Sequence, residues 1–496
     1  MRTLTAQLRR AWTAAGTPKF LVSFLGIWVA VVLFAGIPYG DLSGYDDAVY
    51  AHEARVMLQS GDIWTLNLNG APDFDKPPLF IWLIALTFKL FGVSDLAAKV
   101  PGVICGWCTI ALVYLIVKEL YPAKPDDTSN AEWLPASAML CMATLQYFLK
   151  YASHVMTDVP FTFFFTLALY FYVRGLKVGW YLLLSGAATG AAMLMRSPMG
   201  LFPLVIIVLH LVFTRRFRTL LTPYFFGCVV LCVAIPATWF WREYSIFGQV
   251  FLDQHLRNLA NHSAVAGPFT AWQRFAGYFD YVLLAGRQCL PWFPLAVFGL
   301  YKAARRSVTG RSSVDALLVI WFFVVMVPFS LADAKVLRYI MPAFPVFAIL
   351  SAVTLVGLLK RKYWRRVSQA TVLILLVVGI FAVFSPRYLT RAEDMRTIGP
   401  VADGATGADE TIVLYTSGEL QYGYANQLFW YGHRHLDHIT DIDVIRRRLD
   451  ESGPQVVVMD RESFHRLFEA SLTNFSILGK SANFVCVRVR AIKASL

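Results

Sequence analysis

The sequence predicts a polytopic α-helical membrane protein, and three observations support this prediction. Apolar residues make up 57% of the 496 positions and charged residues only 16%, a composition typical of integral membrane proteins. The apolar residues gather in runs near the length of about 20 residues that a helix needs to cross a bilayer. Basic clusters between these runs fall on one side of the predicted membrane, whereas isolated acidic residues fall on the other.

The apolar runs predict about eleven transmembrane helices. They cover residues 20–37, 100–117, 133–149, 159–173, 180–195, 201–213, 220–240, 278–300, 316–329, 339–359 and 371–384. We do not expect the first run to be a cleaved signal peptide, because it is long for such a segment and lacks a clear small-residue cleavage site.

The charges of the short loops set the predicted topology. Basic residues precede the first run and follow every second run after it, at positions 2–19, 118–124, 174–177, 215–218, 302–311 and 360–366. Because Lys and Arg collect on the cytoplasmic side, the N-terminus is predicted to be cytoplasmic. The net charge of +13 then reflects membrane topology, so we expect membrane lipids as partners and no nucleic acid.

One further apolar run, residues 79–91, is too short for a span, and counting it would place every later basic cluster outside. We therefore predict a helix in the outer membrane interface, a depth that suits Trp82 and Lys89. Residues 38–99 become a large outer loop of juxtamembrane helices. This loop belongs to a predicted transmembrane domain of residues 1–386.

Residues 387–496 change character and predict a small soluble α/β domain on the outer side. Strand patterns at 411–415, 455–459 and 484–489 alternate with helical patterns at 442–449 and 462–470.

The polar residues that interrupt this pattern project onto one layer at the outer membrane surface. Carboxylates beside cations in such a layer suit a reaction on an anionic, lipid-attached substrate, since a carboxylate can accept a proton while Lys and Arg stabilise a phosphate leaving group. The residues of this layer are Asp46, Asp47, Asp75, Lys76, His154, Asp158, Arg196, His255, Arg257, Lys335, Arg338 and Tyr339.

Each of these residues also has a structural interpretation. Asp46 can be a solvated surface carboxylate, and Asp47 is the better candidate to cap the helix that begins nearby. Asp158 can cap the fourth predicted span. Lys76 and Arg196 can extend toward the interface from helix ends.

Several short motifs accompany these polar residues. They are Tyr45-Asp46-Asp47-x-x-Tyr50-Ala51, Phe74-Asp75-Lys76-Pro77-Pro78, Thr157-Asp158, Arg196-Ser197-Pro198, Gln254-His255-Leu256 and Lys335-x-x-x-Tyr339. Together they resemble the GT-C glycosyltransferases of the aminoarabinose lipid A transferase type, relatives of the dolichyl-phosphate-mannose protein mannosyltransferases. The resemblance covers roughly residues 20–385 and is most specific in the first outer loop.

The resemblance implies a GT-C fold and an inverting transfer of a sugar from a polyprenyl (undecaprenyl) monophosphate donor. The acceptor would be lipid A, lipopolysaccharide, a cell-wall glycan or a protein at the periplasmic face of the bacterial inner membrane. No P-loop or Rossmann fingerprint is present, and no nucleotide cofactor is expected. The alternative function is a transporter or flippase for a polyprenyl lipid or glycolipid, which predicts repeat symmetry and charges near the membrane midplane.

The resemblance also implies roles for individual residues. Asp46 and Asp158 match the family's catalytic acidic residues, and Lys76 matches the lysine that meets the donor phosphate. Asp75 stands where the family has Glu, and with His255 it would hold a divalent metal ion. The expected substrate-binding residues are Asp47, Tyr50, Lys76, Arg196, Arg257, Lys335, Arg338 and Tyr339. The departures from the family pattern indicate a relative that acts on another sugar or acceptor.

Overall fold

A computed structural model describes residues 12–36, 42, 46–122, 130–263, 277, 279–310, 312–332, 336–384, 394–407, 410–416, 421–451, 455–469 and 475–489. The chain divides into two compact units, each described here by itself. The first unit comprises Met1–Ile37, Phe74–Phe80 and Val100–Phe384. The second unit comprises Pro38–Asp73, Ile81–Lys99 and Ser385–Leu496, so it joins most of the first outer loop to the C-terminal segment. The division into domains at residue 386 stays a prediction.

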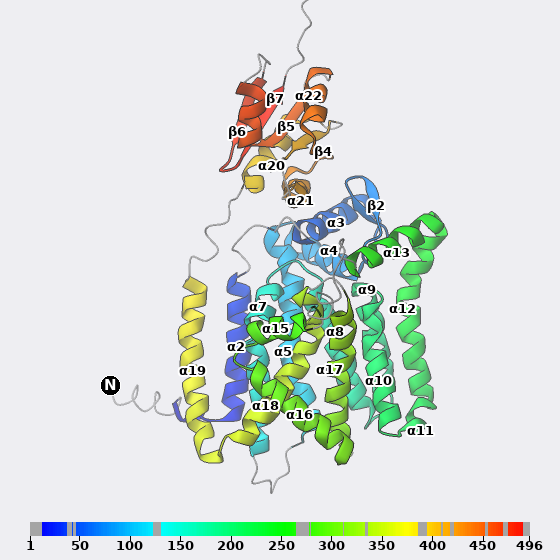
Figure 1. Cartoon of the computed structure of the whole chain (residues 1–496), viewed down its shortest axis with the longest axis vertical. Coiled ribbons are helices and arrows are strands. Elements are labelled where there is room, and N and C mark those ends of the chain that lie inside the picture. Colours follow the sequence, from blue (N-terminus) through cyan, green and yellow to red (C-terminus); the bar gives the residue numbers. More distant parts are fainter. Residues whose placement is uncertain are drawn as a thin grey trace, which may run out of the picture. The chain divides into compact units, whose positions relative to one another are not determined.

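The first unit is a bundle of helices that run alongside one another (Figure 1). Its α-helices are α2 (Pro18–Gly36), α6 (Leu134–Ala143), α7 (Gln146–Ala152), α8 (Asp158–Gly175), α9 (Tyr181–Met195), α10 (Phe202–Phe213), α11 (Phe217–Leu220), α12 (Pro223–Phe247), α13 (Gln249–Ser263), α15 (Asp280–Gln288), α16 (Phe293–Thr309), α17 (Ser313–Leu331), α18 (Phe344–Leu358) and α19 (Arg361–Phe384). Its 3-10 helices are η1 (Asn130–Trp133), η2 (Met199–Leu201) and η3 (Leu337–Ala343). Two helices, α4 (Leu79–Phe91) and α5 (Asp95–Leu120), contribute residues to both units.

Long apolar helices confirm the predicted fold class. Within the described residues, six helical stretches are long and apolar enough to cross a membrane. The total of eleven spans stays a prediction, because several predicted spans are built from shorter helices. Helix α4 has the bounds that the sequence predicted for the interfacial helix, Leu79–Phe91.

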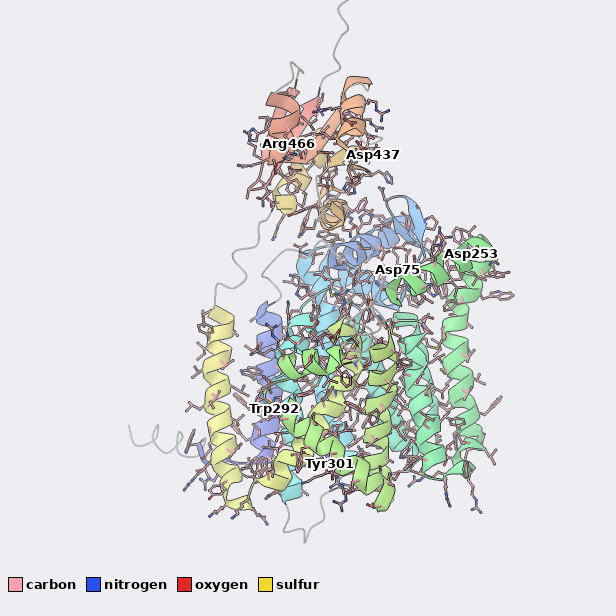
Figure 2. The ribbon with its side chains drawn as sticks, in the orientation of Figure 1. Asp75, Asp253, Trp292, Tyr301, Asp437 and Arg466 are labelled. Carbon is pink, nitrogen blue, oxygen red and sulfur yellow. The ribbon has the colours of Figure 1, made fainter. Side chains whose placement is uncertain are left out.

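Two predicted continuous spans are broken, and the prediction of single helices there was wrong. The span predicted at 278–300 consists of α15 and α16, because Pro291 lacks an N–H and cannot continue a helix. The span predicted at 133–149 consists of η1, α6 and α7, and it breaks where the Thr144 hydroxyl donates to the Leu140 carbonyl. The breaks are connected, since Trp292 (labelled in Figure 2) donates to the Thr144 hydroxyl across 2.8 Å.

Helix α9 approaches α12 unusually closely through two glycines. A Cβ atom at Gly186 would lie 2.2 Å from the Cys228 carbonyl oxygen, and one at Gly190 would lie 2.9 Å from the Leu231 carbonyl oxygen. Small residues four apart allow such contacts between membrane helices, where dispersion forces replace the hydrophobic effect as the driving force. Helix α9 ends at Met195, and Arg196 follows directly.

The second unit contains a five-stranded sheet with the strand order β4-β3-β5-β7-β6. Strands β4, β3 and β5 pair in parallel, whereas β7 pairs antiparallel with both β5 and β6. These strands are β3 (Ile412–Tyr415), β4 (Leu436–Ile439), β5 (Gln455–Asp460), β6 (Phe475–Lys480) and β7 (Phe484–Val489). The unit's helices are α3 (Asp46–Ser60), α20 (Asp394–Ala405), α21 (Gln421–Gly432), α22 (Ile442–Glu451), α23 (Arg461–Phe464) and the π-helix His465–Glu469. A hairpin of β1 (Leu66–Leu68) and β2 (Ala71–Asp73) completes the unit.

The first outer loop and the C-terminal segment are joined by buried polar contacts at the end of α21. Arg55 on α3 donates to the carbonyl oxygens of Phe429 and Trp430, each across 2.7 Å. The carboxylate of Asp95 accepts from Trp430 Nε1 at 2.7 Å and from the Tyr431 hydroxyl at 3.0 Å. Carbonyls in the last turn of a helix have no hydrogen-bond donor within the helix. Arg55 of the first outer loop supplies donors to two carbonyls at the end of α21.

Candidate active site

A buried carboxylate lies at the start of α8. Asp158 is only 1% exposed and occupies the first turn of that helix, where the helix dipole favours a negative charge. The Thr162 hydroxyl donates to the Asp158 backbone carbonyl across 2.8 Å. This bond engages the backbone of Asp158, and its side-chain oxygens contact other partners.

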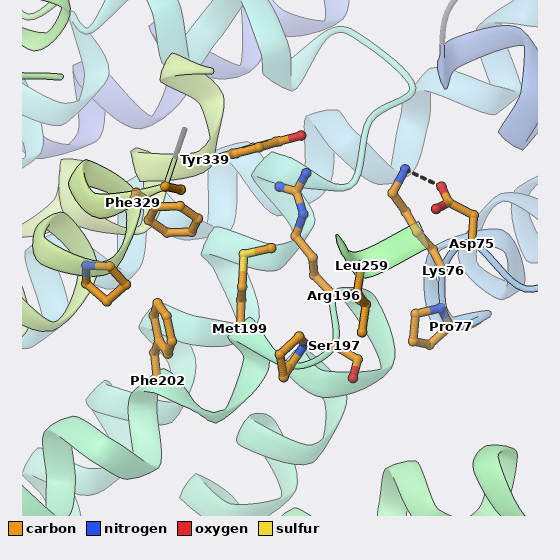
Figure 3. Close-up of a pocket in the computed structure, with 13 residues that line it drawn as sticks. Asp75, Lys76, Pro77, Arg196, Ser197, Met199, Phe202, Leu259, Phe329 and Tyr339 are labelled. Carbon is orange, nitrogen blue, oxygen red and sulfur yellow. Dashed lines mark ion pairs between the residues drawn. The ribbon is translucent and has the colours of Figure 1, made fainter. Parts of the chain in front are cut away.

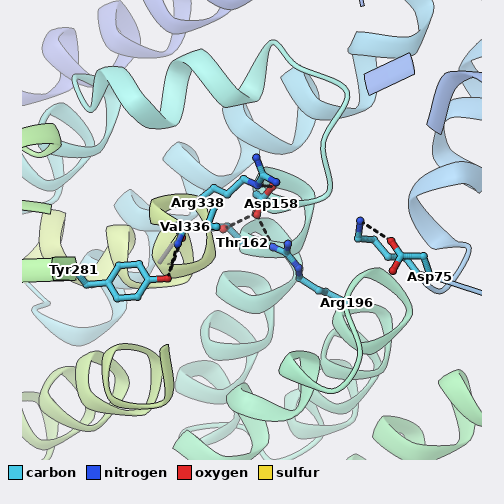
Figure 4. A network of polar contacts seen from close by, with 8 residues as sticks. Asp75, Asp158, Thr162, Arg196, Tyr281, Val336 and Arg338 are labelled. Atoms are coloured by element: carbon cyan, nitrogen blue, oxygen red, sulfur yellow. Dashed lines mark hydrogen bonds and ion pairs between the residues drawn. The ribbon is translucent and has the colours of Figure 1, made fainter. Parts of the chain in front are cut away.

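Two arginines from distant parts of the chain meet this carboxylate (Figure 4). Arg196, which follows the last residue of α9, donates to Asp158 Oδ1 through Nη1. Arg338 in η3 places Nε 3.6 Å from Asp158 Oδ2. The Arg196 guanidinium also lies over the ring of Tyr339, 4.5 Å from its centroid, so a cation–π contact adds to the ion pair. The cluster thus holds two cations around one anion.

The segment Phe74–Asp75–Lys76 is anchored through Phe74. The Phe74 ring is 3% exposed and contacts the rings of Phe247 and Phe251 at 5.1 and 5.2 Å between centroids. Its carbonyl oxygen is 2.8 Å from Nδ1 of His255 on α13. Next to this anchor, Lys76 Nζ lies 3.1 Å from Asp75 Oδ2.

A pocket with a volume of about 320 Å³ brings these segments together (Figure 3). Lys76, Arg196 and Tyr339 supply its cationic and aromatic part, and Asp75 supplies a carboxylate. Most of the remaining wall is apolar and comes from Pro77, Pro198, Met199, Phe202, Leu259, Pro328, Phe329 and Ala332. Cations beside an apolar wall fit a ligand that carries both an anionic head and a hydrocarbon tail.

The structure groups some of the predicted site residues and separates others. Asp158, Arg196, Arg338 and Tyr339 form one cluster, and Lys76 shares a pocket with Arg196 and Tyr339. Arg257 on α13 is exposed and does not line this pocket. Lys335 and Tyr45 lie outside the described residues.

Three predicted residues of the first outer loop, namely Asp46, Asp47 and Tyr50, belong to the second unit. Asp46 is the first residue of α3 and is partly exposed, whereas Asp47 is 1% exposed and Tyr50 is 5% exposed. The accessible carboxylate of this pair is therefore Asp46.

Sequence reasoning missed Tyr281. Its hydroxyl accepts from the Val336 N–H across 3.0 Å and lies 3.1 Å from the Val336 carbonyl oxygen. These contacts hold the chain just before η3, which carries Arg338 and Tyr339. The sequence placed Tyr281 inside a continuous span, whereas the structure places it in the short helix α15 with its hydroxyl against Val336.

His255 has the features of a metal-ligating histidine. Its Nδ1 is fixed by the Phe74 carbonyl, as in many metal sites where the second ring nitrogen is held by a carbonyl, and its buried Nε2 has no hydrogen-bond partner. Burial lowers the pKa of His255 more than the Phe74 carbonyl and Asp75 raise it, which favours the neutral form that binds metals. Within the described residues, however, no three His, Cys, Asp or Glu residues are grouped to hold an ion.

Comparisons with known proteins identify relatives of this architecture. The family model for dolichyl-phosphate-mannose-protein mannosyltransferases matches residues 75–241. An uncharacterized protein from Aquifex aeolicus is 28% identical over 338 residues, which cover 67% of this chain and 63% of that protein. The undecaprenyl phosphate-alpha-4-amino-4-deoxy-L-arabinose arabinosyl transferase of Pseudomonas paraeruginosa is 27% identical over 332 residues, which cover 64% of this chain and 56% of that protein. The matches therefore span less than two thirds of either relative.

Solved structures show the same fold over nearly the whole chain. The crystal structure of ArnT from Cupriavidus metallidurans in the apo state has a TM-score of 0.74 at 18% sequence identity, and the match covers 95% of this chain and 98% of that one. The archaeal oligosaccharyltransferase AglB from Archaeoglobus fulgidus has a TM-score of 0.53 at 14% identity, covering 94% and 74% of the two chains. The predicted fold of the GT-C type is thus confirmed.

The buried ion pair predicts a strong energetic coupling. Either Asp158→Asn or Arg196→Gln should destabilise the protein by about 3–5 kcal/mol, because each leaves a buried charge without its main partner. The loss of stability in the double variant should be smaller than the sum of the two single losses by about 1 kcal/mol or more. Thermal unfolding in detergent measures both quantities.

A second double-mutant cycle on Arg448 and Asp437 provides the control. That pair is 2.9 Å apart, but its side chains are 43% and 38% exposed, so its coupling should stay below about 1 kcal/mol. Equal couplings in the two cycles would show that the Asp158 cluster is no stronger than a surface ion pair.

Proposed function

We propose that the chain is an inverting glycosyltransferase, because the protein mannosyltransferase model matches residues 75–241, an aminoarabinose transferase is 27% identical over 332 residues, and the fold is of the GT-C type. Its donor is a sugar linked to a polyprenyl monophosphate. Its acceptor is lipid A, lipopolysaccharide, a cell-wall glycan or a protein. The named relatives are transferases, and none of the comparisons reported above supports the transporter alternative.

The pocket around Arg196 is the observation on which this proposal rests. Its apolar wall suits the hydrocarbon chain of a polyprenyl phosphate, and Lys76 and Arg196 suit the phosphate. One of the solved structures, ArnT from Cupriavidus metallidurans, contains undecaprenyl phosphate. The long apolar helices make this chain a multi-pass membrane protein, and its basic loops favour an orientation in the bacterial inner membrane with the site on the periplasmic side.

The proposed reaction is a single displacement at the anomeric carbon. An acceptor hydroxyl oxygen attacks this carbon, the bond from the carbon to the phosphate oxygen breaks, and polyprenyl phosphate leaves with the electron pair. The hydroxyl proton passes to a carboxylate, a role that we assign to Asp46 on the strength of its motif and its partial exposure. Lys76 and Arg196 stabilise the charge that grows on the departing phosphate.

Asp158 contributes to this reaction through the arginines. Its Oδ1 is engaged by Arg196 and its Oδ2 faces Arg338, so both oxygens are committed to cations. The carboxylate fixes the Arg196 guanidinium, and the Tyr339 ring supports it from one side. Preorganised cations stabilise developing charge without the cost of reorientation during the reaction.

A divalent ion is a further part of the proposal. Asp75 and His255 would hold it, and the phosphate oxygens of the donor would complete the coordination, as is common for ions bound by few carboxylates. When bound, such an ion supplies charge stabilisation at the phosphate. The Nε2 atom of His255, buried and without a hydrogen-bond partner, supports this arrangement.

Sugar transfer by membranes that carry Asp46→Asn tests the proposed base. Transfer from undecaprenyl-phosphate-linked sugars should fall by about 10²–10⁴-fold, which is the usual contribution of general base catalysis. Asp62→Asn is the matched control, because Asp62 lies in the same loop and its Oδ1 accepts from the Trp64 and Thr65 N–H groups, which an Asn oxygen can also do. Undiminished transfer by Asp46→Asn, with normal insertion, would refute the role of Asp46.

Lys76→Met tests the donor pocket. The variant should lose about tenfold or more in affinity for undecaprenyl phosphate, because hydrogen bonds to charged groups contribute about 1.5–3 kcal/mol. Binding of the labelled lipid to purified protein measures this loss. Lys89→Met on α4, a lysine outside the pocket, should bind as the native protein does, and an equal loss in both variants would contradict a specific contact at Lys76.

Mn²⁺ binding in the presence of undecaprenyl phosphate tests the metal proposal, and electron paramagnetic resonance measures this binding. Asp75→Asn and His255→Asn should each weaken Mn²⁺ binding by about tenfold or more, because each variant removes one of the proposed metal ligands. His465→Asn, at an exposed position of the second unit, serves as the control. Binding that is unchanged in all three variants would place any ion elsewhere.

A further inference from the structure

A second pocket lies wholly within the second unit and has a volume of about 280 Å³. Helix α3, the hairpin between β1 and β2, and the segment between α21 and β4 line it. Its side chains include two arginines, three histidines and three amides, and none of the lining residues is a carboxylate. Such a set of donors is suited to an anion bound together with hydroxyl groups.

Three of its walls are held in place by specific contacts. Arg55 is 5% exposed and is fixed by the carbonyls at the end of α21. Asn69 in the hairpin donates to the Leu436 carbonyl at 3.1 Å and accepts from the Leu436 N–H at 3.0 Å. Gly70 has a φ of +81°, and a Cβ atom there would lie 2.8 Å from the ring of His435. The walls of the pocket are therefore held in place, and they come from the first outer loop and from the C-terminal segment.

Arg55 supplies a positive charge to this pocket at neutral pH, whereas His52 does not. Burial and the neighbouring Arg55 lower the pKa of His52 to about 4, and burial lowers the pKa of Arg55 only to about 10. His52 is therefore neutral, whereas Arg55 stays charged. Arg434 pairs with Asp403 through Nε at 2.7 Å, and His433 Nδ1 is 3.5 Å from the same carboxylate.

We propose that this pocket binds the phosphate group of a phosphorylated saccharide. The arginines would hold the phosphate, and Gln59 and Asn67 would bind hydroxyl groups of the sugar. Two sources carry this chemistry, namely a soluble sugar phosphate and the phosphorylated headgroup of a glycolipid. The proposal concerns binding alone, so it can be tested without measuring the proposed sugar transfer.

Binding to the full-length protein in detergent, without a polyprenyl donor, tests the proposal. Glucose 6-phosphate and inorganic phosphate represent the soluble source, detergent-dispersed lipid A represents the glycolipid, and glucose is the uncharged comparison. Arg434→Gln should weaken binding of the phosphorylated probes by about tenfold or more, because a charge-assisted contact is lost. His433→Asn should also weaken it, while the Asn tolerates the positive φ of 53° at this position.

Arg448→Gln is the matched control. It removes an arginine–aspartate pair of similar length, 2.9 Å to Asp437, from the same unit but outside the pocket, and it should bind the probes as the native protein does. Binding of lipid A alone identifies the headgroup as the source, and binding of glucose 6-phosphate identifies a soluble sugar phosphate. The proposal is overturned if no phosphorylated probe binds, if glucose binds equally well, or if the Arg434 and His433 variants bind normally.

Discussion

The ion pair between Asp158 and Arg196 is the interaction on which the candidate active site depends. Both residues are less than 10% exposed, and charges in such places are tolerated only when they are paired. Residues 158, 196 and 338 come from three separate segments of the chain, yet they meet around one carboxylate. Any displacement of α8, α9 or η3 would expose an unpaired charge to an apolar environment. The cluster thereby fixes the geometry of the pocket beside it.

The bundle positions these three segments by close packing and by a few buried hydrogen bonds. The glycines of α9 let its backbone approach α12, and Arg196 follows the last residue of this helix. The Tyr281 hydroxyl holds the backbone of Val336. Val336 directly precedes η3, the helix that carries Arg338 and Tyr339. In a membrane, where apolar association gives little preference for one packing over another, small residues and polar contacts specify the arrangement.

Hydrophobic runs and loop charges were sufficient to predict the class of fold, because both signals are local. The strands at 412–415, 455–460 and 484–489 were also predicted to within one residue, since each is a continuous apolar run that becomes buried. Strands β4 and β6 were missed because their sequences, Leu436–Ile439 and Phe475–Lys480, mix polar and apolar residues without a buried run. Broken spans were missed because hydropathy does not register a proline or a hydroxyl that interrupts a helix.

The candidate site was predicted as a layer of polar residues, but its internal pairings could not be. Sequence position placed Asp158 and Arg196 at the ends of two helices, whereas their contact depends on how α8 and α9 pack. Arg257 and Arg196 were both predicted to bind the substrate. Arg257 is exposed, because Phe251 and His255 occupy the buried face of α13. Tyr281 gave no signal at all, since a tyrosine in an apolar run has no distinctive pattern.

The second unit links the proposed base to the proposed phosphate pocket through one helix. Asp46 begins α3, and Arg55 lies nine residues later on the same helix; at 1.5 Å per residue they are about 14 Å apart along its axis. A rigid helix therefore sets a fixed spacing between the carboxylate that would activate an acceptor hydroxyl and the cation that would hold a phosphate. Because Arg55 also secures the end of α21, the C-terminal segment stabilises this spacing. Nine residues make about two and a half turns, so the two side chains project from opposite faces of α3. The proposed phosphate pocket and the proposed base therefore lie on different faces of one helix, and the pocket is a separate binding site.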